Sequence, residues 1–293
     1  MHVPARYLVK TDHEVTFGLV DQRYVEPMLP PESNPVTTRA KLAPELSRLS
    51  ERIVAEYPDF LVFDKPAHLL VHPTKPDNSR TLWLELRNLL AFEQANGGQI
   101  SILTRLDRET SGAVLVAKTP AAARRLGLKM HQHAIEKIYL AVVFGWPEED
   151  NFTVDAPLLR LGTVEPSRIW LKQAIHPTGQ PAISHFWVER RWTHNGRRFA
   201  LIRCQPITGR THQIRVHLAS RGHSLVGDKI YGPDENAYLE FIKTGWTDKL
   251  AQHLLLPRHA LHAAELSFEY EGVFHRFEVP FAADLTGFTS QSD

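Results

Sequence analysis

The sequence predicts an α+β protein whose sheet is mixed and largely antiparallel, with helices at its flanks. Three observations support this fold class. Segments with the apolar pattern of strands outnumber segments with helical spacing. Several neighbouring strands are separated only by hairpin turns, such as Asn195-Gly196 and Glu271-Gly272. The run 113–117 is apolar throughout, as expected of a strand that is buried on both faces.

The chain is expected to consist of two parts. Residues 1–50 are rich in proline and polar residues, so we expect a partly irregular N-terminal extension of unclear role. A folded domain is expected over residues 51–293. It begins with extended segments at 53–57, 60–63 and 69–71. A helix capped by Ser79 or Thr81 should then run to Gly97-Gly98, because leucines recur there at helical spacing.

The second half alternates between strong helix starts and strand patterns. Thr119-Pro120 places a hydroxyl at the N-cap and a proline at the first helical position, so a helix is predicted to run to about residue 134. A short helix should open at Thr208–Thr211 and end at Gly222, and another should lie between residues 235 and 256. The predicted strands are 137–143, 168–175, 182–191, 199–205, 264–270 and 273–279.

Composition excludes several classes of protein. No apolar run approaches the roughly 20 residues that a membrane span needs. The N-terminus lacks a secretory signal, and Cys204, the single cysteine, cannot form an intrachain disulfide, so a cytoplasmic protein is expected. The net charge is only +1, yet arginines occur in local clusters that could converge on one face and contact phosphates.

One acidic residue stands out. Asp107 lies between Arg105 and Arg108, and the small-residue turn at 110–112 separates it from the apolar run. A carboxylate on a loop ahead of a rigid core strand is a candidate reactive group. The alternative is that Asp107 only pairs with a neighbouring arginine and orders the turn.

Set side by side, several stretches resemble the RluA family of RNA pseudouridine synthases, over roughly residues 53 to 279. They are Asp64-Lys65-Pro66 with Val71-His72-Pro73, the loop from Arg105 to Gly112, the stretch from Pro206 to Leu218, Gly227-Asp228-Lys229-Ile230-Tyr231-Gly232, and Leu261-His262-Ala263.

This resemblance implies the pseudouridine-synthase catalytic fold with a central RNA-binding cleft, and the isomerisation of uridine in RNA without cofactor or metal. The family's catalytic aspartate falls on Asp107, its pocket tyrosine on Tyr139, and the arginine that pairs with the aspartate on Arg215. The remaining cleft residues expected to contact RNA are Arg105, Arg108, Arg210, His212 and Lys65.

Two positions depart from the family pattern. Thr104 stands where the family usually has histidine, and His68 stands where it often has glycine. Neither belongs to the catalytic set, and both were expected to bear on which RNA is recognised. His131-Gln132-His133 lacks a further metal ligand at useful spacing, so no metal site is expected there. A monomer is the expectation from the family.

Two other functions remain open at this point. An inactive RNA-binding or ribosome-assembly factor could share the fold, although binding alone does not require the Asp107 carboxylate. A glycosidase would need a second acidic residue across the reacting bond, for which Glu109 is the nearest candidate. The substrate is expected to be ribosomal or transfer RNA.

Overall fold

The structure, a computed structural model, describes residues 7–11, 14–18, 49–74, 80–234 and 236–291. The chain divides into two units, Met1–Ala43 and Pro44–Asp293, which are treated separately. In the first unit, β1 (Tyr7–Thr11) and β2 (Glu14–Gly18) form an antiparallel pair that we had not predicted. The other residues of the expected extension up to residue 48 lie outside the described part, so its role and boundary remain predictions.

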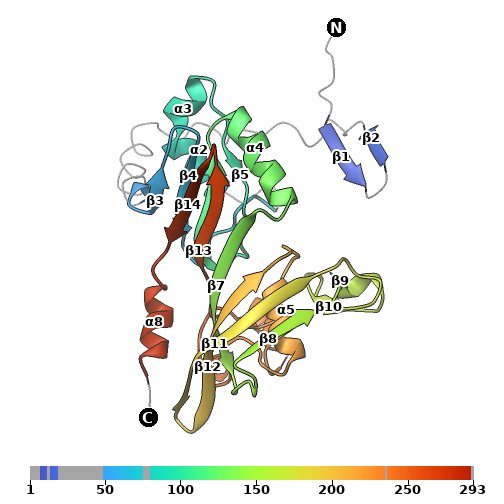
Figure 1. The fold of residues 1–293 in the computed structure, drawn as a ribbon. Coiled ribbons are helices and arrows are strands. Elements are labelled where there is room, and N and C mark those ends of the chain that lie inside the picture. Colours follow the sequence, from blue (N-terminus) through green and yellow to red (C-terminus); the bar gives the residue numbers. More distant parts are fainter. Residues whose placement is uncertain (1–6, 12–13, 19–48, 75–79, 235, 292–293) are drawn as a thin grey trace. The chain divides into compact units, whose positions relative to one another are not determined.

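The second unit is built on one ten-stranded mixed sheet (Figure 1). Its strand order is β3-β4-β6-β13-β7-β12-β11-β8, with β5 also paired to β6 and β14 to β13. Among the described pairs of this sheet, β6–β13 is parallel and the others are antiparallel. This confirms the predicted α+β class. The strands are β3 (Ile53–Glu56), β4 (Phe60–Lys65), β5 (Ser101–Ile102), β6 (Ser111–Ala117), β7 (Ile135–Phe144), β8 (Asn151–Asp155), β11 (Ile183–His194), β12 (Arg197–Pro206), β13 (Leu261–Tyr270) and β14 (Val273–Glu278).

Both predicted hairpins form at the predicted turns. Asn195 and Gly196 have φ of 50° and 68° between β11 and β12, and Glu271 and Gly272 have φ of 51° and 78° between β13 and β14. Two consecutive left-handed residues are what a two-residue hairpin turn requires, because they match the right-handed twist of the strands.

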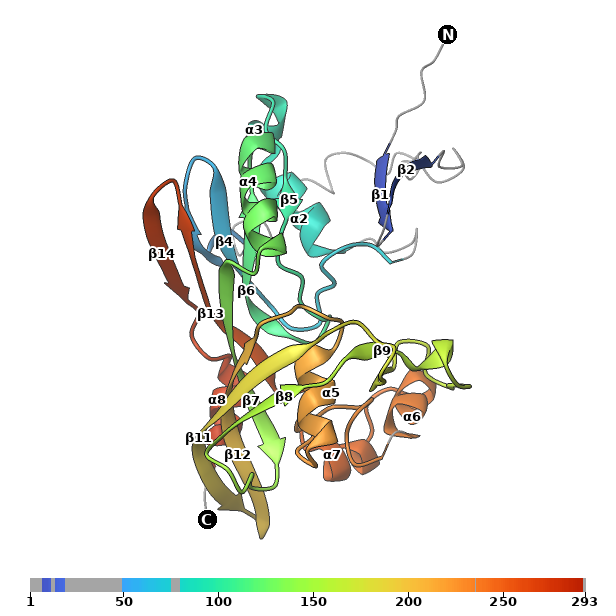
Figure 2. The same ribbon diagram turned by 45° about the vertical axis from the view of Figure 1, so that its right-hand side comes forward.

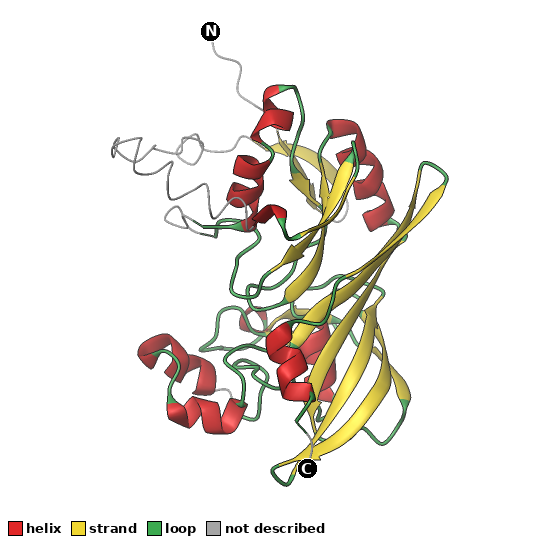
Figure 3. Cartoon of the chain, turned by 90° about the vertical axis from the view of Figure 1, so that its left-hand side faces the viewer, coloured by secondary structure: helices red, strands yellow, loops and turns green. Residues whose placement is uncertain are grey.

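Helices flank the two halves of the sheet. Figures 2 and 3 show α2–α4 beside the half that contains β4 and β6, and α5–α7 beside the half that contains β11 and β12. Thr81 and Thr119 accept hydrogen bonds from the backbone at the starts of α2 and α4, as predicted. The helices are α2 (Leu82–Leu89), α3 (Ala91–Ala95), α4 (Pro120–His131), α5 (Gln213–Ser220), α6 (Asn236–Thr244), α7 (Asp248–Leu254) and α8 (Ala283–Thr289).

Several element predictions were wrong. The single helix expected up to Gly97 is interrupted at Leu90, and the helix expected between 235 and 256 is two helices. The strand predicted at 168–175 is reduced to β10 (Gln173–Ile175), which pairs with β9 (Leu158–Arg160) outside the large sheet. We had predicted neither β8 nor α8. Their short apolar patterns, five and seven residues long, carry little periodicity.

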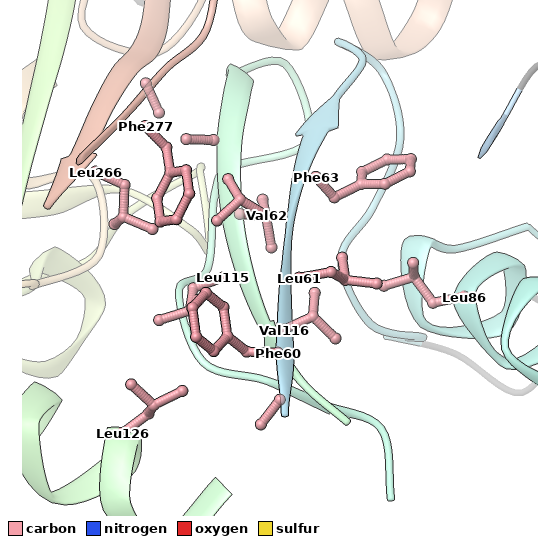
Figure 4. Close-up of a cluster of buried hydrophobic side chains, with 14 of the residues drawn as sticks. Phe60, Leu61, Val62, Phe63, Leu86, Leu115, Val116, Leu126, Leu266 and Phe277 are labelled. Atoms are coloured by element: carbon pink, nitrogen blue, oxygen red, sulfur yellow. The ribbon is translucent and has the colours of Figure 1, made fainter. Parts of the chain in front are cut away.

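The main hydrophobic core surrounds β4 and β6 (Figure 4). All seven residues of β6 are buried, which confirms the prediction for the apolar run. Phe60 and Phe63 of β4, Leu115 of β6 and Leu126 of α4 are each at most 1% exposed. Burial of each such side chain stabilises the fold by about 2 kcal/mol, so β6 is a rigid base for the loop that precedes it.

Candidate active site

The Asp107 loop joins β5 to β6 and is fastened at both ends. At its start, Leu103 N–H donates to Leu115 O at 2.8 Å, and Thr104 Oγ1 accepts from Leu115 N–H at 2.8 Å. At its end, the Thr110 hydroxyl lies 2.7 Å from His259 Nε2. These bonds tie the loop to the buried strand, so the Asp107 backbone is held in place before any substrate arrives.

Gly112 allows β6 to approach β13 at the point where the loop ends. Its φ is 108°, and a Cβ atom there would lie 2.2 Å from Ala263 O. Only glycine fits this position, because a side chain would both clash with the backbone and strain it. Gly112 is thus required by the close parallel pairing of β6 and β13, and the turn predicted at 110–112 is shorter than expected because Ser111 and Gly112 already belong to β6.

Arg215 of α5 connects Asp107 with the part of the site that comes from the second half of the chain. Its Nη1 donates to Asp107 Oδ2 at 2.8 Å, while Nε and Nη2 donate to Asp228 Oδ2 and Oδ1 at 2.7 and 2.9 Å. Asp228 is fully buried, and its Oδ1 also accepts from the backbone N–H groups of Ile230 and Tyr231. The bidentate pair fixes the guanidinium plane, so Arg215 presents one N–H to Asp107 in a set direction.

The charge of Asp107 is well defined. Burial alone would raise the pKa of its carboxyl, but the positive charges of His212, when protonated, and of Arg215 outweigh burial and lower it to about 2. Its side chain is 27% exposed and lines the cleft. Asp107 is therefore an accessible carboxylate, ionised at neutral pH.

Tyr139 of β7 also lines this cleft, packed between the two main hydrophobic clusters. Burial, and then the nearby Asp107 charge, raise the pKa of its phenol, so the hydroxyl stays protonated. Within the described part of the chain, no hydrogen bond holds that hydroxyl. The ring and its O–H are consequently available to a bound base.

His212 also lines the cleft, and its backbone is in the left-handed conformation with φ of 56°. Tyr231 Oη accepts from Gln173 N–H at 2.8 Å and lies 2.8 Å from His212 Nδ1. Burial is the main cause that lowers the pKa of His212 to about 4. Since the ring is neutral and Tyr231 can donate to Nδ1, the proton is expected on Nε2, which lies 3.9 Å from Asp107 Oδ2.

Seven of the eight residues predicted for the site line one cleft of about 500 Å³. Among those that line it are Asp107, Tyr139, Arg215, Arg105, Arg108, Arg210 and His212. Arg105 and Arg108 are exposed at the cleft, and Arg210 is half-buried with Nε donating to Pro181 O at 3.0 Å. The structure thus brings these basic residues together at the cleft that contains Asp107, while their contact with RNA stays a prediction.

Lys65 is a correction to the predicted set. Its side chain is fully buried, and its ammonium donates to the carbonyls of Pro66, Leu69 and Arg108 at 2.8 to 3.2 Å. An ammonium enclosed in this way cannot reach an RNA phosphate, and burial lowers its pKa to about 7. Lys65 instead holds the segment 66–69 against the Asp107 loop.

The two departures from the family pattern also have structural roles. His68 has φ of 67°, the left-handed region in which glycine is at no disadvantage. Thr104 is 3% exposed and its hydroxyl is bonded to Leu115. Thr104 therefore holds the loop, and we withdraw the expectation that it helps to select the RNA.

Glu109, the second carboxylate that a glycosidase would need, is not available for catalysis. Glu109 Oε1 accepts from Lys229 Nζ at 2.7 Å, and Oε2 accepts from His259 N–H at 3.2 Å. Glu109 is absent from the residues that line the Asp107 cleft. Glu109 therefore joins the Asp107 loop to the segment 229–259 and is not a partner of Asp107 in catalysis.

Sequence reasoning missed two residues of the site. Asp228 was quoted within its motif, but its role as the anchor of Arg215 depends on a contact between separate segments. Lys137 lines the cleft two residues before Tyr139, and burial lowers the pKa of its ammonium. The alternation of β7 was the available signal, because residues two apart share a face of the sheet.

Two further searches cover the described residues only. No group of three metal-ligating side chains comes together among them. None of their helices combines the length and apolar character that crossing a bilayer requires.

A model of the RNA pseudouridylate synthase family matches residues 59–220. Ribosomal large subunit pseudouridine synthase D of Nitrosomonas europaea is 35% identical over 239 residues, 80% of this chain and 63% of that protein. The synthase D of Zymomonas mobilis is 36% identical over 219 residues, 74% of this chain and 64% of that protein. The chain thus spans less than two thirds of the length of these two relatives.

Solved structures agree with this assignment. Human RNA Pseudouridylate Synthase Domain Containing 1 has a TM-score of 0.59 at 25% identity, covering 80% of this chain and 85% of that one. Human RNA Pseudouridylate Synthase Domain Containing 4 shares the fold, with a TM-score of 0.65 at 21% identity over 85% of this chain and 95% of that one. The chain belongs to the RluA family of RNA pseudouridine synthases.

Proposed function

We propose that this protein isomerises uridine to pseudouridine within RNA. The observation that carries the proposal is the Asp107–Arg215 pair, an ionised carboxylate held at 2.8 Å by a guanidinium inside a 500 Å³ cleft. The Tyr139 ring lines the same cleft. A binding protein would have no use for an exposed carboxylate beside negatively charged RNA, so this geometry favours the enzyme over the inactive factor.

The reaction balances without an external reagent. The N1–C1′ bond breaks, the base turns over, C5 bonds to C1′, and the proton lost from C5 is matched by one gained at N1. Asp107 can act by attack at C1′, by attack at C6, or by removal of a proton from C2′. Each of these requires the ionised carboxylate that Arg215 maintains.

Tyr139 is proposed to receive the base. A uridine inside a stack cannot be reached, so the target nucleotide must be flipped into the cleft. The Tyr139 ring offers it a stacking face, and the protonated hydroxyl lies near the reacting carbons. Arg105, two residues before Asp107, is proposed to enter the space that the flipped base leaves.

Ribosomal RNA is the proposed substrate, because the relatives named above carry ribosomal large subunit pseudouridine synthase D as their name. Transfer RNA is the alternative. We propose a cytoplasmic monomer that needs neither metal nor cofactor. Arg108 and Arg210 at the cleft would hold phosphates on either side of the target.

The test is an isomerisation assay on the full chain. RNA transcribed with uridine tritiated at C5 should release tritium with the wild-type protein and none with Asp107→Asn, which preserves the size of the side chain. Asp150→Asn, at an exposed carboxylate distant from the cleft, is the control and should retain full activity. Tritium release by a correctly folded Asp107→Asn protein would refute the proposal. Large-subunit ribosomal RNA and transfer RNA, assayed separately, identify the substrate.

A further inference from the structure

A small arm leaves the large sheet next to the cleft. It consists of residues 158–180, in which β9 and β10 pair antiparallel and the 3-10 helix η2 (Leu161–Thr163) follows β9. Figures 1 and 2 show this β9–β10 arm extending beyond α5, away from the large sheet. None of the residues of the arm lines the cleft.

The arm exposes a tryptophan that a folded domain would normally cover. Trp170 is 72% exposed, and its neighbour Leu171 is 49% exposed. The guanidinium of Arg160 lies over the Trp170 ring at 3.7 Å from its centroid. With a cation over one face of the ring and most of the residue in solvent, the Trp170 ring is accessible to a second planar partner.

The charges of the arm favour a polyanionic partner. The arm contains three basic residues and one acidic residue, whereas the net charge of the whole chain is only +1. They are Arg160, Arg168, Lys172 and Glu165. Arg168 is exposed, close in sequence to the Trp170 ring. Basic side chains interleaved with an exposed aromatic ring are the pattern of single-stranded nucleic-acid binding, where the backbone is neutralised and a base stacks.

The root of the arm is bonded to the walls of the cleft. Gln173 N–H donates to Tyr231 Oη at 2.8 Å, and the same hydroxyl lies 2.8 Å from His212 Nδ1. Arg210 Nε donates to Pro181 O at the other end of the arm. Since His212 and Arg210 both line the cleft, RNA leaving the cleft on this side would run along the arm.

We propose that the β9–β10 arm is a second RNA-binding site, in which an unpaired base outside the target uridine stacks on Trp170. Arg160 supports the ring on one face, and the exposed Arg168 contacts a neighbouring phosphate. This inference rests on the proposed function for the kind of polymer, but it assigns a separate surface with a separate ligand group. A platform of this kind would select RNA with a single-stranded segment next to the modified position.

The experiment uses an RNA that cannot be isomerised. A fluorescein-labelled oligoadenylate of about 12 nucleotides, a length within the usual range of single-strand site sizes, is titrated with the full chain. An abasic oligomer with the same number of phosphates is titrated in parallel. Trp170→Ala should weaken binding of the oligoadenylate about tenfold, the loss expected for one stacked base, and leave binding of the abasic oligomer unchanged.

Two variants complete the design. Trp170→Phe keeps a ring and should restore most of the affinity for the oligoadenylate. Phe274→Ala removes an aromatic residue that is 69% exposed on β14 and should change neither affinity. Thermal denaturation of each variant verifies that the fold is intact.

The proposal is overturned if Trp170→Ala binds oligoadenylate as well as the wild type does. It is also overturned if both oligomers lose affinity equally, because the effect would then not be stacking. The outcome is independent of the proposed function. A chain that forms no pseudouridine yet binds oligoadenylate through Trp170 refutes the activity alone, and an active chain with no Trp170 effect refutes the arm alone.

Discussion

Arg215 Nη1 donates a hydrogen bond of 2.8 Å to Asp107 Oδ2, across 108 positions of sequence. The other two nitrogens of the same guanidinium, Nε and Nη2, donate to Asp228. The buried carboxylate of Asp228 thus fixes the orientation in which Arg215 contacts the reactive carboxylate of Asp107. Its own pKa is raised despite burial, mainly by Asp228. The pair therefore stays charged over the whole working range of pH.

Replacing Arg215 by lysine should lower turnover about a hundredfold, because small losses of geometry at a reacting group have effects of that size. A lysine ammonium is a point charge and cannot hold Asp107 and Asp228 in one plane. Single-turnover rates measure the effect.

Arg215→Ala should in addition shift the acid limb of the pH–rate profile to higher pH, since one of the charges that lower the pKa of Asp107 is gone. Arg191→Lys, at a half-buried arginine outside the cleft lining, should have the turnover of the wild type. An Arg215→Lys protein with unchanged turnover would contradict the positioning role.

Asp228→Asn should destabilise the fold by about 3 kcal/mol, the usual effect of removing one partner from a buried ion pair. The reason is that Arg215, only 4% exposed, would keep its charge without full compensation. Urea unfolding at neutral pH measures the change. Asp150→Asn breaks an exposed pair with Arg191 and should cost less than about 1 kcal/mol. Equal losses in the two variants would show that Asp228 is not the anchor.

Tyr139→Phe should reduce turnover while RNA affinity stays within about twofold of the wild type, because the ring that stacks is retained. Tyr139→Ala should reduce both. Filter binding and single-turnover assays separate the two quantities. The matched control is Tyr57→Phe, at a partly exposed tyrosine outside the cleft. Full activity of Tyr139→Phe would leave the hydroxyl without a chemical role.

Arg105→Ala should impair a stem-loop substrate more than an unstructured oligonucleotide that carries the same uridine. Arg105 is exposed at the cleft two residues before Asp107, where it can replace the flipped base in the stack. The ratio of kcat/KM on the two RNAs is the readout, and Arg276→Ala on β14 is the control. Equal losses on both RNAs would mean that Arg105 only neutralises phosphate.

Stability should fall as the pH is lowered from about 6.5 to about 4, because of three histidines. Burial is the largest cause that lowers the pKa of His212, His259 and His262, to about 4, 3 and 4 respectively. In this window the unfolded chain binds more protons than the folded chain, so acid favours unfolding by up to about 2 kcal/mol per histidine near pH 5. Asp107 acts in the same sense but at lower pH, between about 3.8 and 2, where the unfolded chain again binds more protons than the folded chain.

Urea unfolding at about pH 7 and pH 5 tests this dependence. His262→Gln removes a histidine that is 1% exposed and lies outside the cleft lining, so its stability should depend less on pH. His253→Gln, at an exposed histidine, should keep the wild-type dependence. A His262→Gln variant with the wild-type pH dependence would show that His262 does not contribute.

Local features of the sequence were read correctly because local physics dictates them. The apolar run 113–117 must be buried, Asn195-Gly196 must turn tightly, and Thr119-Pro120 must begin a helix. The resemblance of the motifs then identified Asp107, Tyr139 and Arg215, which the structure brings to one cleft. Short elements such as β8 and α8 were missed because a few residues carry too little periodicity to outweigh packing against distant segments.

The sequence alone determined the α+β class, the family and the carboxylate around which the site is built. Only the tertiary structure decided that Asp228 orients Arg215, that Lys65 is enclosed by three carbonyls rather than exposed to RNA, and that Trp170 projects on an arm fastened to the cleft. Composition and spacing reveal which groups a segment carries. Burial, charge pairing and hydrogen bonds between separate segments decide what those groups are free to do.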